Sequence, residues 1–223
     1  MRTTKTLAED APSAVYQCRL PLSTKTLTLV AGLLRGHLKA IGSRRRKPPS
    51  GKIALIVLAV LRHDRRLADM AGGNNVSAST IRRWVLEVID LLAARAPRLD
   101  RILKQIAKAG GQVVLLDGTL VRTRRRTGQA NRKNYSGKHK VHGLSFLALT
   151  DEQGNLIWIS SAKPGRSSEI TTARHNKITA WLRRFDLGDL KNWRVLTRLR
   201  LNARHATALL RALLVLTRLE VAR

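Results

Sequence analysis

"QVVLLDGTLV", residues Gln112–Val121, is the stretch that decides how this chain folds. It is short and rich in Val and Leu, and it follows Gly110-Gly111, where the helical spacing of upstream apolar residues ends. Such a run is typical of a buried strand. Two more runs follow, "KVHGLSFLALT" and "NLIWISSAKP", and the "DEQG" between them has the chemistry of a turn. The sequence therefore predicts three successive strands.

Upstream of these strands, apolar residues recur at helical spacing. Residues 52–61, "KIALIVLAVL", indicate a buried helix. After it, Leu67 and Met70 sit three apart before the Gly72-Gly73 break, and a new, longer helix is expected to begin at a cap formed by Ser77 or Ser79. Pro97 then ends or bends that helix. Helix, short polar turn and longer helix is the pattern of a helix-turn-helix DNA-binding domain, and an ordinary helical hairpin with a solvated basic face shares it.

If the pattern is a helix-turn-helix, the first turn of the longer helix faces DNA. A recognition helix presents its N-terminal residues to base edges, while hydroxyl and guanidinium groups also contact phosphates. The candidate DNA-binding residues in this turn are Ser77, Ser79, Thr80, Arg82 and Arg83.

Two helices are expected after the third strand. Ser167 or Ser168 can cap the run "SEITTARHNKITAWLRRF", and Asn202 can cap a Leu-rich amphipathic helix at the end of the chain. In the first of these runs the residues close to one helical stripe are Ile170, Ala173, Ile178, Trp181 and Leu182.

The expected organisation has three parts. Residues 1–50 form an N-terminal arm and basic linker, residues 51–108 a helical DNA-binding domain, and residues 111–223 a domain of mixed strands and helices. The fold class is accordingly α+β, or α/β within the last part.

The charge of the chain points to a polyanionic partner. Its 43 Lys and Arg against 14 Asp and Glu give a formal net charge of +29, so nucleic acid is the leading candidate, and a ribosomal or nucleoid-packing protein shares this property. We find no run of 18 apolar residues, and Cys18 is the only cysteine. We therefore expect a cytoplasmic, nucleoid-associated protein with no membrane partner.

Asp117 is the one carboxylate within a strongly basic segment. Between Gly110 and Lys140 it stands among eight Lys or Arg residues. A carboxylate is the ligand that hard cations such as Mg²⁺ or Mn²⁺ prefer, yet an Asp-Gly pair also forms turns by accepting backbone hydrogen bonds. The cations proposed to hold DNA phosphates near it are Arg122, Arg124, Arg125, Arg126, Lys138 and Lys140.

Glu169 is the second candidate ligand. It follows a Pro-Gly turn at the end of the third strand, from which a sheet edge could bring it back beside the end of the first strand. A glutamate in the first turn of a helix is equally explained by the helix dipole.

Taken together, the motifs resemble transposases of bacterial insertion sequences in the DDE superfamily. The resemblance rests on "LLDGTLVRTRR", "NYSGKHKVHGLSFLALTDEQGNLIWISSAKPGRSSEITTARH" and "LKNWRVLTRLRLNARHATALLRALLVLT", in that order, and extends upstream to about residue 50. It implies a helix-turn-helix followed by a ribonuclease H-like mixed sheet with flanking helices. It also implies that Asp117 and Glu169 are catalytic, metal-binding carboxylates.

The chain departs from this family after Phe185. Relatives continue with a strand that ends in an aspartate and a helix that carries a glutamate, whereas "RRFDLGDLKNWR" passes almost directly to the final motif. The resemblance thus implies an internal deletion, with the endonuclease domain incomplete after about residue 185. Asp186 and Asp189 are the nearby acids that could substitute. An incomplete sheet exposes an edge, so a homo-oligomer is a further expectation.

Three functions follow from these features. The first is a working transposase that binds terminal inverted repeats and target DNA and cuts and joins strands by metal-dependent phosphoryl transfer. The second is a shortened transposase that binds DNA but is catalytically impaired, because losing carboxylates removes charge stabilisation from a two-metal site. The third is a basic DNA-binding protein or regulator without catalysis. The sequence favours the second.

Overall fold

The computed structural model of the chain describes residues 20–43, 46, 48–110, 113–123, 131–151, 154–178, 180–181, 188–190 and 203–221. The chain divides into two compact units, Met1–Leu86 and Glu87–Arg223. None of the helices in the described part of the chain is long and apolar enough to span a membrane.

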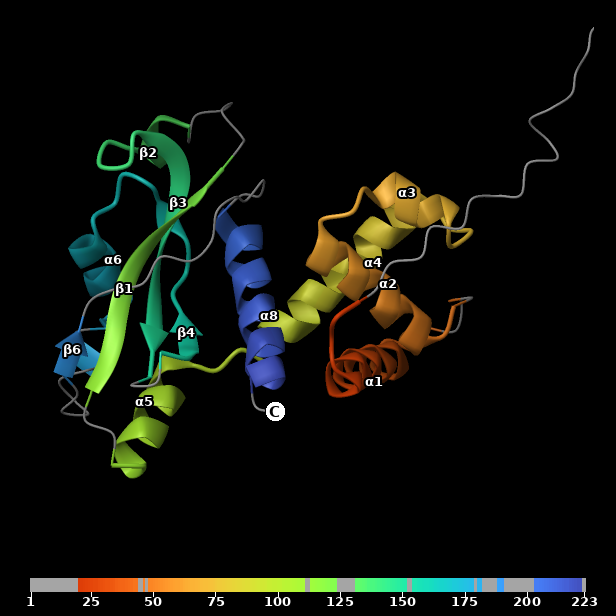
Figure 1. Cartoon of the computed structure of the whole chain (residues 1–223), viewed down its shortest axis with the longest axis horizontal. Coiled ribbons are helices and arrows are strands. Elements are labelled where there is room, and N and C mark those ends of the chain that lie inside the picture. The colour runs from red at the N-terminus through yellow and green to blue at the C-terminus, as the bar shows by residue number, and fades with distance from the viewer. Residues whose placement is uncertain are drawn as a thin grey trace, which may run out of the picture. The chain divides into compact units, whose positions relative to one another are not determined.

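The first unit is helical (Figure 1). Its helices are α1 (Thr24–Ala40), α2 (Ser50–His63), α3 (Leu67–Gly72) and the first half of α4 (Ala78–Ala93). Ser23 caps α1 because its Oγ accepts a hydrogen bond from the backbone N–H of Thr26 at 3.2 Å. The core of this unit contains Leu34, Ile53, Leu58 and Ile81, all nearly inaccessible to solvent.

The second unit is built on a six-stranded sheet. Its strands are β1 (Val113–Arg122), β2 (Tyr135–Ser136), β3 (Val141–Thr150), β4 (Leu156–Ile159), β5 (Lys163–Pro164) and β6 (Gly188–Leu190). The order is β2-β3-β1-β6, and β4 and β5 also pair with β3. β6 runs parallel to β1 and the other pairings are antiparallel, so the sheet is mixed.

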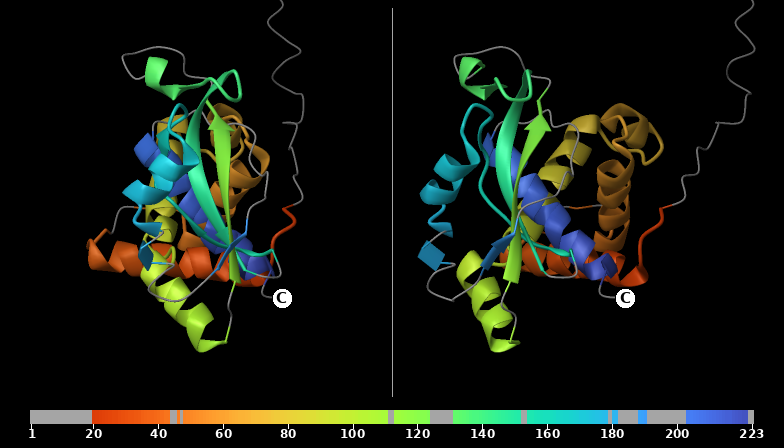
Figure 2. Two further views of the ribbon diagram at one scale, coloured as in Figure 1. Left: turned by 90° about the vertical axis from the view of Figure 1, so that its left-hand side faces the viewer. Right: turned by 60° about the vertical axis from the view of Figure 1, so that its left-hand side comes forward.

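Helices cover the two faces of this sheet, with α6 (Glu169–His175) on one side and α8 (Ala203–Val221) on the other (Figure 2). Leu116, Leu147 and Leu149 pack on the α6 side with α5 (Leu99–Lys108) and Ile178. Val121, Leu144 and Phe146 pack with α8. Alternate residues of β1 and β3 thus enter two different cores, as the period of a strand requires.

Four expectations from the sequence differ from the structure. Residues 24–40, expected within an arm, form α1, whose buried residues include Val30 and Leu34. α5 lies within the residues expected for the DNA-binding domain, but its apolar face packs in the core of the sheet. The helix expected over "SEITTARHNKITAWLRRF" is interrupted, because α6 ends at its cap Asn176 and the next residue, Lys177, has a φ of +54°. Ile170, expected on the apolar stripe of that helix, is 64 % exposed. Finally, β6 forms where no strand was expected.

Candidate catalytic and nucleic-acid-binding site

Asp117 lies in the middle of β1, the strand flanked by both β3 and β6. It is in register with Ala148 on β3 and is partly buried. The Asp-Gly pair that could have formed a turn is therefore part of a continuous ten-residue strand. The strand fixes the position of the carboxylate, as a catalytic or metal-binding residue requires.

Glu169 is the first residue of α6, and its backbone is held by the helix cap. Ser168 is the cap: its Oγ accepts a hydrogen bond from the Thr171 N–H at 3.1 Å, and its carbonyl accepts one from Thr172 Oγ1 at 3.0 Å. Of the two serines proposed as caps, Ser168 is the one observed. A Ser cap with an acid in the next position is a favourable helix start.

The side chain of Glu169 lies directly over Gly118. A Cβ atom placed on Gly118 would be 2.6 Å from Glu169 Cδ and 2.9 Å from Oε1, distances at which real atoms overlap. Glycine at this position is therefore what allows the carboxylate to rest on β1. Glu169 thus returns to the first strand as expected, but to its middle and not to its end, one residue from Asp117.

The two carboxylates nevertheless lie on opposite faces of the sheet. Successive residues of a strand point to opposite faces, and Gly118 faces Glu169 on the α6 side. Asp117 consequently faces the α8 side, as do its neighbours Val121 and Phe146 in the α8 core. The thickness of the sheet separates the two acids, so they do not fit the shared metal site that the sequence suggested.

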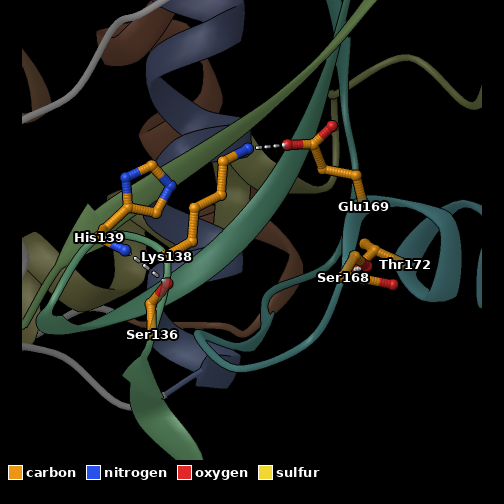
Figure 3. A network of polar contacts seen from close by, with 6 residues as sticks. All are labelled: Ser136, Lys138, His139, Ser168, Glu169 and Thr172. Carbon is orange, nitrogen blue, oxygen red and sulfur yellow. Dashed lines mark hydrogen bonds and ion pairs between the residues drawn. The ribbon is translucent and has the colours of Figure 1, made fainter.

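On the α6 side, a pocket of about 400 Å³ surrounds the Glu169 carboxylate. Lys138 reaches across it, with Nζ 3.4 Å from Glu169 Oε1 (Figure 3). The lysine side chain is 76 % exposed and the glutamate 39 %, so water screens this ion pair strongly. Other residues lining the pocket are Ser136, Ser145, Gly165 and Arg166. The charged side chains of the lining other than Glu169 are the cations Lys138 and Arg166, and Leu120 and Ile170 add apolar surface.

The acids that could complete a metal site do not converge in the part of the chain that is described. No group of three or more His, Cys, Asp or Glu residues among the described residues could hold a metal ion. Asp151 Oδ1 instead accepts a hydrogen bond from the Asn155 N–H at 2.7 Å, closing the turn between β3 and β4. Asp189 is in register with Val114 on the neighbouring strand, and Asp186 lies outside the described residues.

The candidate DNA-binding residues of the first unit gather at the start of α4. Ser77 Oγ accepts a hydrogen bond from the Thr80 N–H at 3.2 Å and lies 2.9 Å from Ser79 Oγ. Arg83 donates to Thr80 Oγ1 at 3.3 Å, and Arg82 and Arg83 are exposed. The buried side of the helix is formed by Ile81 and Trp84, so the polar residues are left on its outer side.

The basic residues proposed around Asp117 are only partly described. Arg122, Lys138 and Lys140 are exposed at one end of the sheet. Arg124, Arg125 and Arg126 lie outside the described residues, as does Asn202, the expected cap of α8.

Comparison with known families identifies the segment that contains both carboxylates. Residues 116–186 match the DDE superfamily endonuclease family. The DDE segment begins on β1, one residue before Asp117, and ends just before β6. Endonucleases of this superfamily act on DNA and generally use divalent metal ions. Comparison of the chain with curated proteins and with solved structures gave no match.

Sequence reasoning missed two features of the DDE segment. One is that Gly118 leaves room for the Glu169 side chain to pack on β1. The other is the contact between Lys138 and Glu169, which are 31 residues apart. The signal for the first was present, because a glycine inside a Val- and Leu-rich strand often marks a close approach. Nothing local predicts the second, because it depends on how the hairpin before β3 and α6 meet.

Proposed function

We propose that this chain is a DNA transposase of an insertion sequence that binds terminal inverted repeats and target DNA but is impaired in cutting and joining strands. The observation that carries the proposal is the DDE endonuclease match over residues 116–186, with Asp117 fixed in the middle of β1. Asp117 is the candidate catalytic carboxylate.

Binding to DNA is assigned to two groups of residues. In the first unit, α3, the turn from Gly73 to Ser77 and α4 supply the order of elements that a helix-turn-helix needs, with Ser77, Ser79, Thr80, Arg82 and Arg83 toward DNA. In the second unit, Arg122, Arg124, Arg125, Arg126, Lys138 and Lys140 are proposed to contact phosphates. The net charge of +29 supports phosphate binding along much of the chain.

Impairment is inferred from the positions of the acids. Two-metal phosphoryl transfer needs carboxylates that converge on ions about 3.5–4 Å apart. Asp117 and Glu169 lie on opposite faces of the sheet. The sequence between Phe185 and Leu190 contains the short strand β6 and is too short to carry the helix of the family as well. No group of three or more His, Cys, Asp or Glu residues forms in the described part of the chain, so Asp117 is proposed to supply only part of a Mg²⁺ or Mn²⁺ site.

The test uses the full chain and DNA that flanks its gene, on a supercoiled plasmid. We expect retarded migration on a gel, which demonstrates binding, and no strand nicking with Mg²⁺ or Mn²⁺ above the level of Asp117→Ala. Nicking that Asp117→Ala abolishes would show a working endonuclease and disprove impairment. Equal, weak binding to flanking and unrelated DNA would instead favour a basic DNA-binding protein that does not recognise element ends.

A further inference from the structure

The hairpin between β2 and β3 forms a strongly basic tip at one end of the sheet. We define the basic tip by six exposed cations, which are Arg122, Arg132, Lys133, Lys138, Lys140 and Arg166. Glu169 is an acid that contacts one of these cations, Lys138. The tip therefore carries a large local excess of positive charge.

Backbone contacts hold the basic tip in one shape. Tyr135 and Ser136 pair with His142 and Val141 in an antiparallel hairpin, and the His139 N–H donates to Ser136 Oγ at 3.4 Å inside the turn (Figure 3). The Arg166 N–H donates to the Lys133 carbonyl at 3.3 Å, which joins the hairpin to the segment before α6. A surface prepared in this way loses little conformational freedom when it binds a ligand.

The close approach of these two segments requires Gly165. A Cβ atom on this residue would be 2.5 Å from the Asn134 carbonyl oxygen and 2.7 Å from that of Gly143. The glycine brings Arg166 beside Lys133 although 33 positions separate them in the sequence. The clustering of the cations is thus a property of the fold.

Tyr135 is an exposed aromatic residue on the hairpin that carries the basic tip. It is 43 % exposed. Its ring makes a T-shaped contact with the ring of His142, with 5.1 Å between the two ring centroids. This contact restricts the ring while a large part of its surface stays open to solvent. Tyrosine is one of the few side chains that offer a flat surface to a nucleic-acid base.

Tyr135 also lies on the same face of the sheet as Asp117. Tyr135 is opposite His142, and Asp117 is opposite Ala148, six residues farther along β3. Residues an even number apart share a face, and six residues of strand span about 20 Å. Between them on this face, Leu144 and Phe146 are buried under α8, so the open surface at Tyr135 is separate from Asp117.

We propose that the basic tip binds single-stranded DNA, with an unpaired base stacked on Tyr135 and the backbone phosphates held by the six cations. This proposal rests on the proposed function, because it identifies which form of DNA the second unit binds. A base within a duplex has its faces covered by neighbouring bases, so stacking on Tyr135 requires an unpaired or extruded base. Duplex DNA would meet only the charges of the tip.

The experiment measures binding by the full chain in buffer with EDTA, so that it does not depend on strand cutting. The ligands are a single-stranded oligonucleotide containing 2-aminopurine and the duplex of the same sequence. The variants are Tyr135→Ala, Tyr135→Phe and, as a matched control, Ile170→Ala, which removes another exposed large apolar side chain of the same unit.

We expect Tyr135→Ala to weaken single-strand binding about 5- to 150-fold, the effect of losing one stacked base, and to change duplex binding by less than about twofold. Tyr135→Phe and Ile170→Ala should bind like the wild type. The wild type and Tyr135→Phe should quench 2-aminopurine fluorescence. Absence of quenching by the folded wild type, or equal weakening of single-strand and duplex binding by Tyr135→Ala, would overturn the proposal. Nicking of DNA in a separate assay with Mg²⁺, together with retained quenching, would contradict only the proposed catalytic impairment and would leave the assignment of the basic tip standing.

Discussion

The packing of the Glu169 side chain against Gly118 gives the most specific prediction about the fold around the candidate site. Replacing Gly118 with Ala puts a methyl group 2.6 Å from Glu169 Cδ, and the three heavy atoms nearest to it all belong to Glu169. Overpacking of this kind costs about 1–3 kcal/mol. Because Glu169 is 39 % exposed and can rotate toward water, we expect the lower half of that range, about 1–2 kcal/mol.

The same substitution should have the opposite sign when Glu169 is absent. Alanine in a strand is favoured over glycine by about 0.5–1 kcal/mol, since glycine loses more conformational freedom on folding. The φ of Gly118 is not in the positive range that disfavours other residues. In a Glu169→Ala background, Gly118→Ala should therefore stabilise the protein by about 0.5 kcal/mol, which gives a coupling of about 2 kcal/mol between the two positions.

Urea unfolding of the wild type, the two single variants and the double variant measures this coupling. Gly137→Ala is the matched control, because Gly137 lines the same pocket and a methyl group added to it would meet no heavy atom within 4 Å. Its effect should be the same with and without Glu169. Equal effects of Gly118→Ala in both backgrounds would refute the placement of Glu169 on β1.

Further predictions concern single positions in both units. Ser160→Ala should cost about 1–3 kcal/mol in thermal or urea unfolding, because the fully buried Ser160 Oγ accepts the Leu147 N–H at 2.9 Å and that donor would lose its partner; a change below about 0.5 kcal/mol would show that water replaces the hydroxyl. Lys138→Ala should change unfolding free energy by less than about 1 kcal/mol, because its ion pair is exposed; a larger loss would mean that the pair is shielded from water. Arg82→Ala with Arg83→Ala should weaken DNA binding and lower the slope of log affinity against log salt by about one for each phosphate that the protein no longer neutralises; an unchanged slope would argue against the helix-turn-helix assignment.

Much of the architecture could be predicted because it follows from local periodicity. The strands around Leu116, Phe146 and Ile157 were visible as short apolar runs, and the helix capped by Ser168 began at an expected position. α1 was missed because its buried residues are few and lie beside a basic segment. The end of α6 was missed because Lys177 adopts a left-handed conformation that its residue type does not announce.

The candidate site could be predicted only in part, because face assignment depends on register. The sequence identified Asp117 and Glu169 and expected the sheet to bring them together, and Glu169 does rest on β1. The sequence could not predict that Glu169 packs over Gly118 and not over Asp117. This difference of one position along β1 decides the outcome, because neighbouring residues of a strand point to opposite faces of the sheet. The cluster of Lys133 and Arg166 likewise arises from contact between distant segments.

The most direct test of the central claim is a Mn²⁺ titration followed by electron paramagnetic resonance, with the wild type, Asp117→Asn and Glu169→Gln. If the two carboxylates lie on opposite faces of the sheet, any Mn²⁺ site that Asp117→Asn weakens keeps its affinity in Glu169→Gln. In a variant with both substitutions, the two effects on Mn²⁺ affinity then simply add. A single Mn²⁺ site that both substitutions weaken to a similar extent would contradict the account, because it would place Asp117 and Glu169 around one ion.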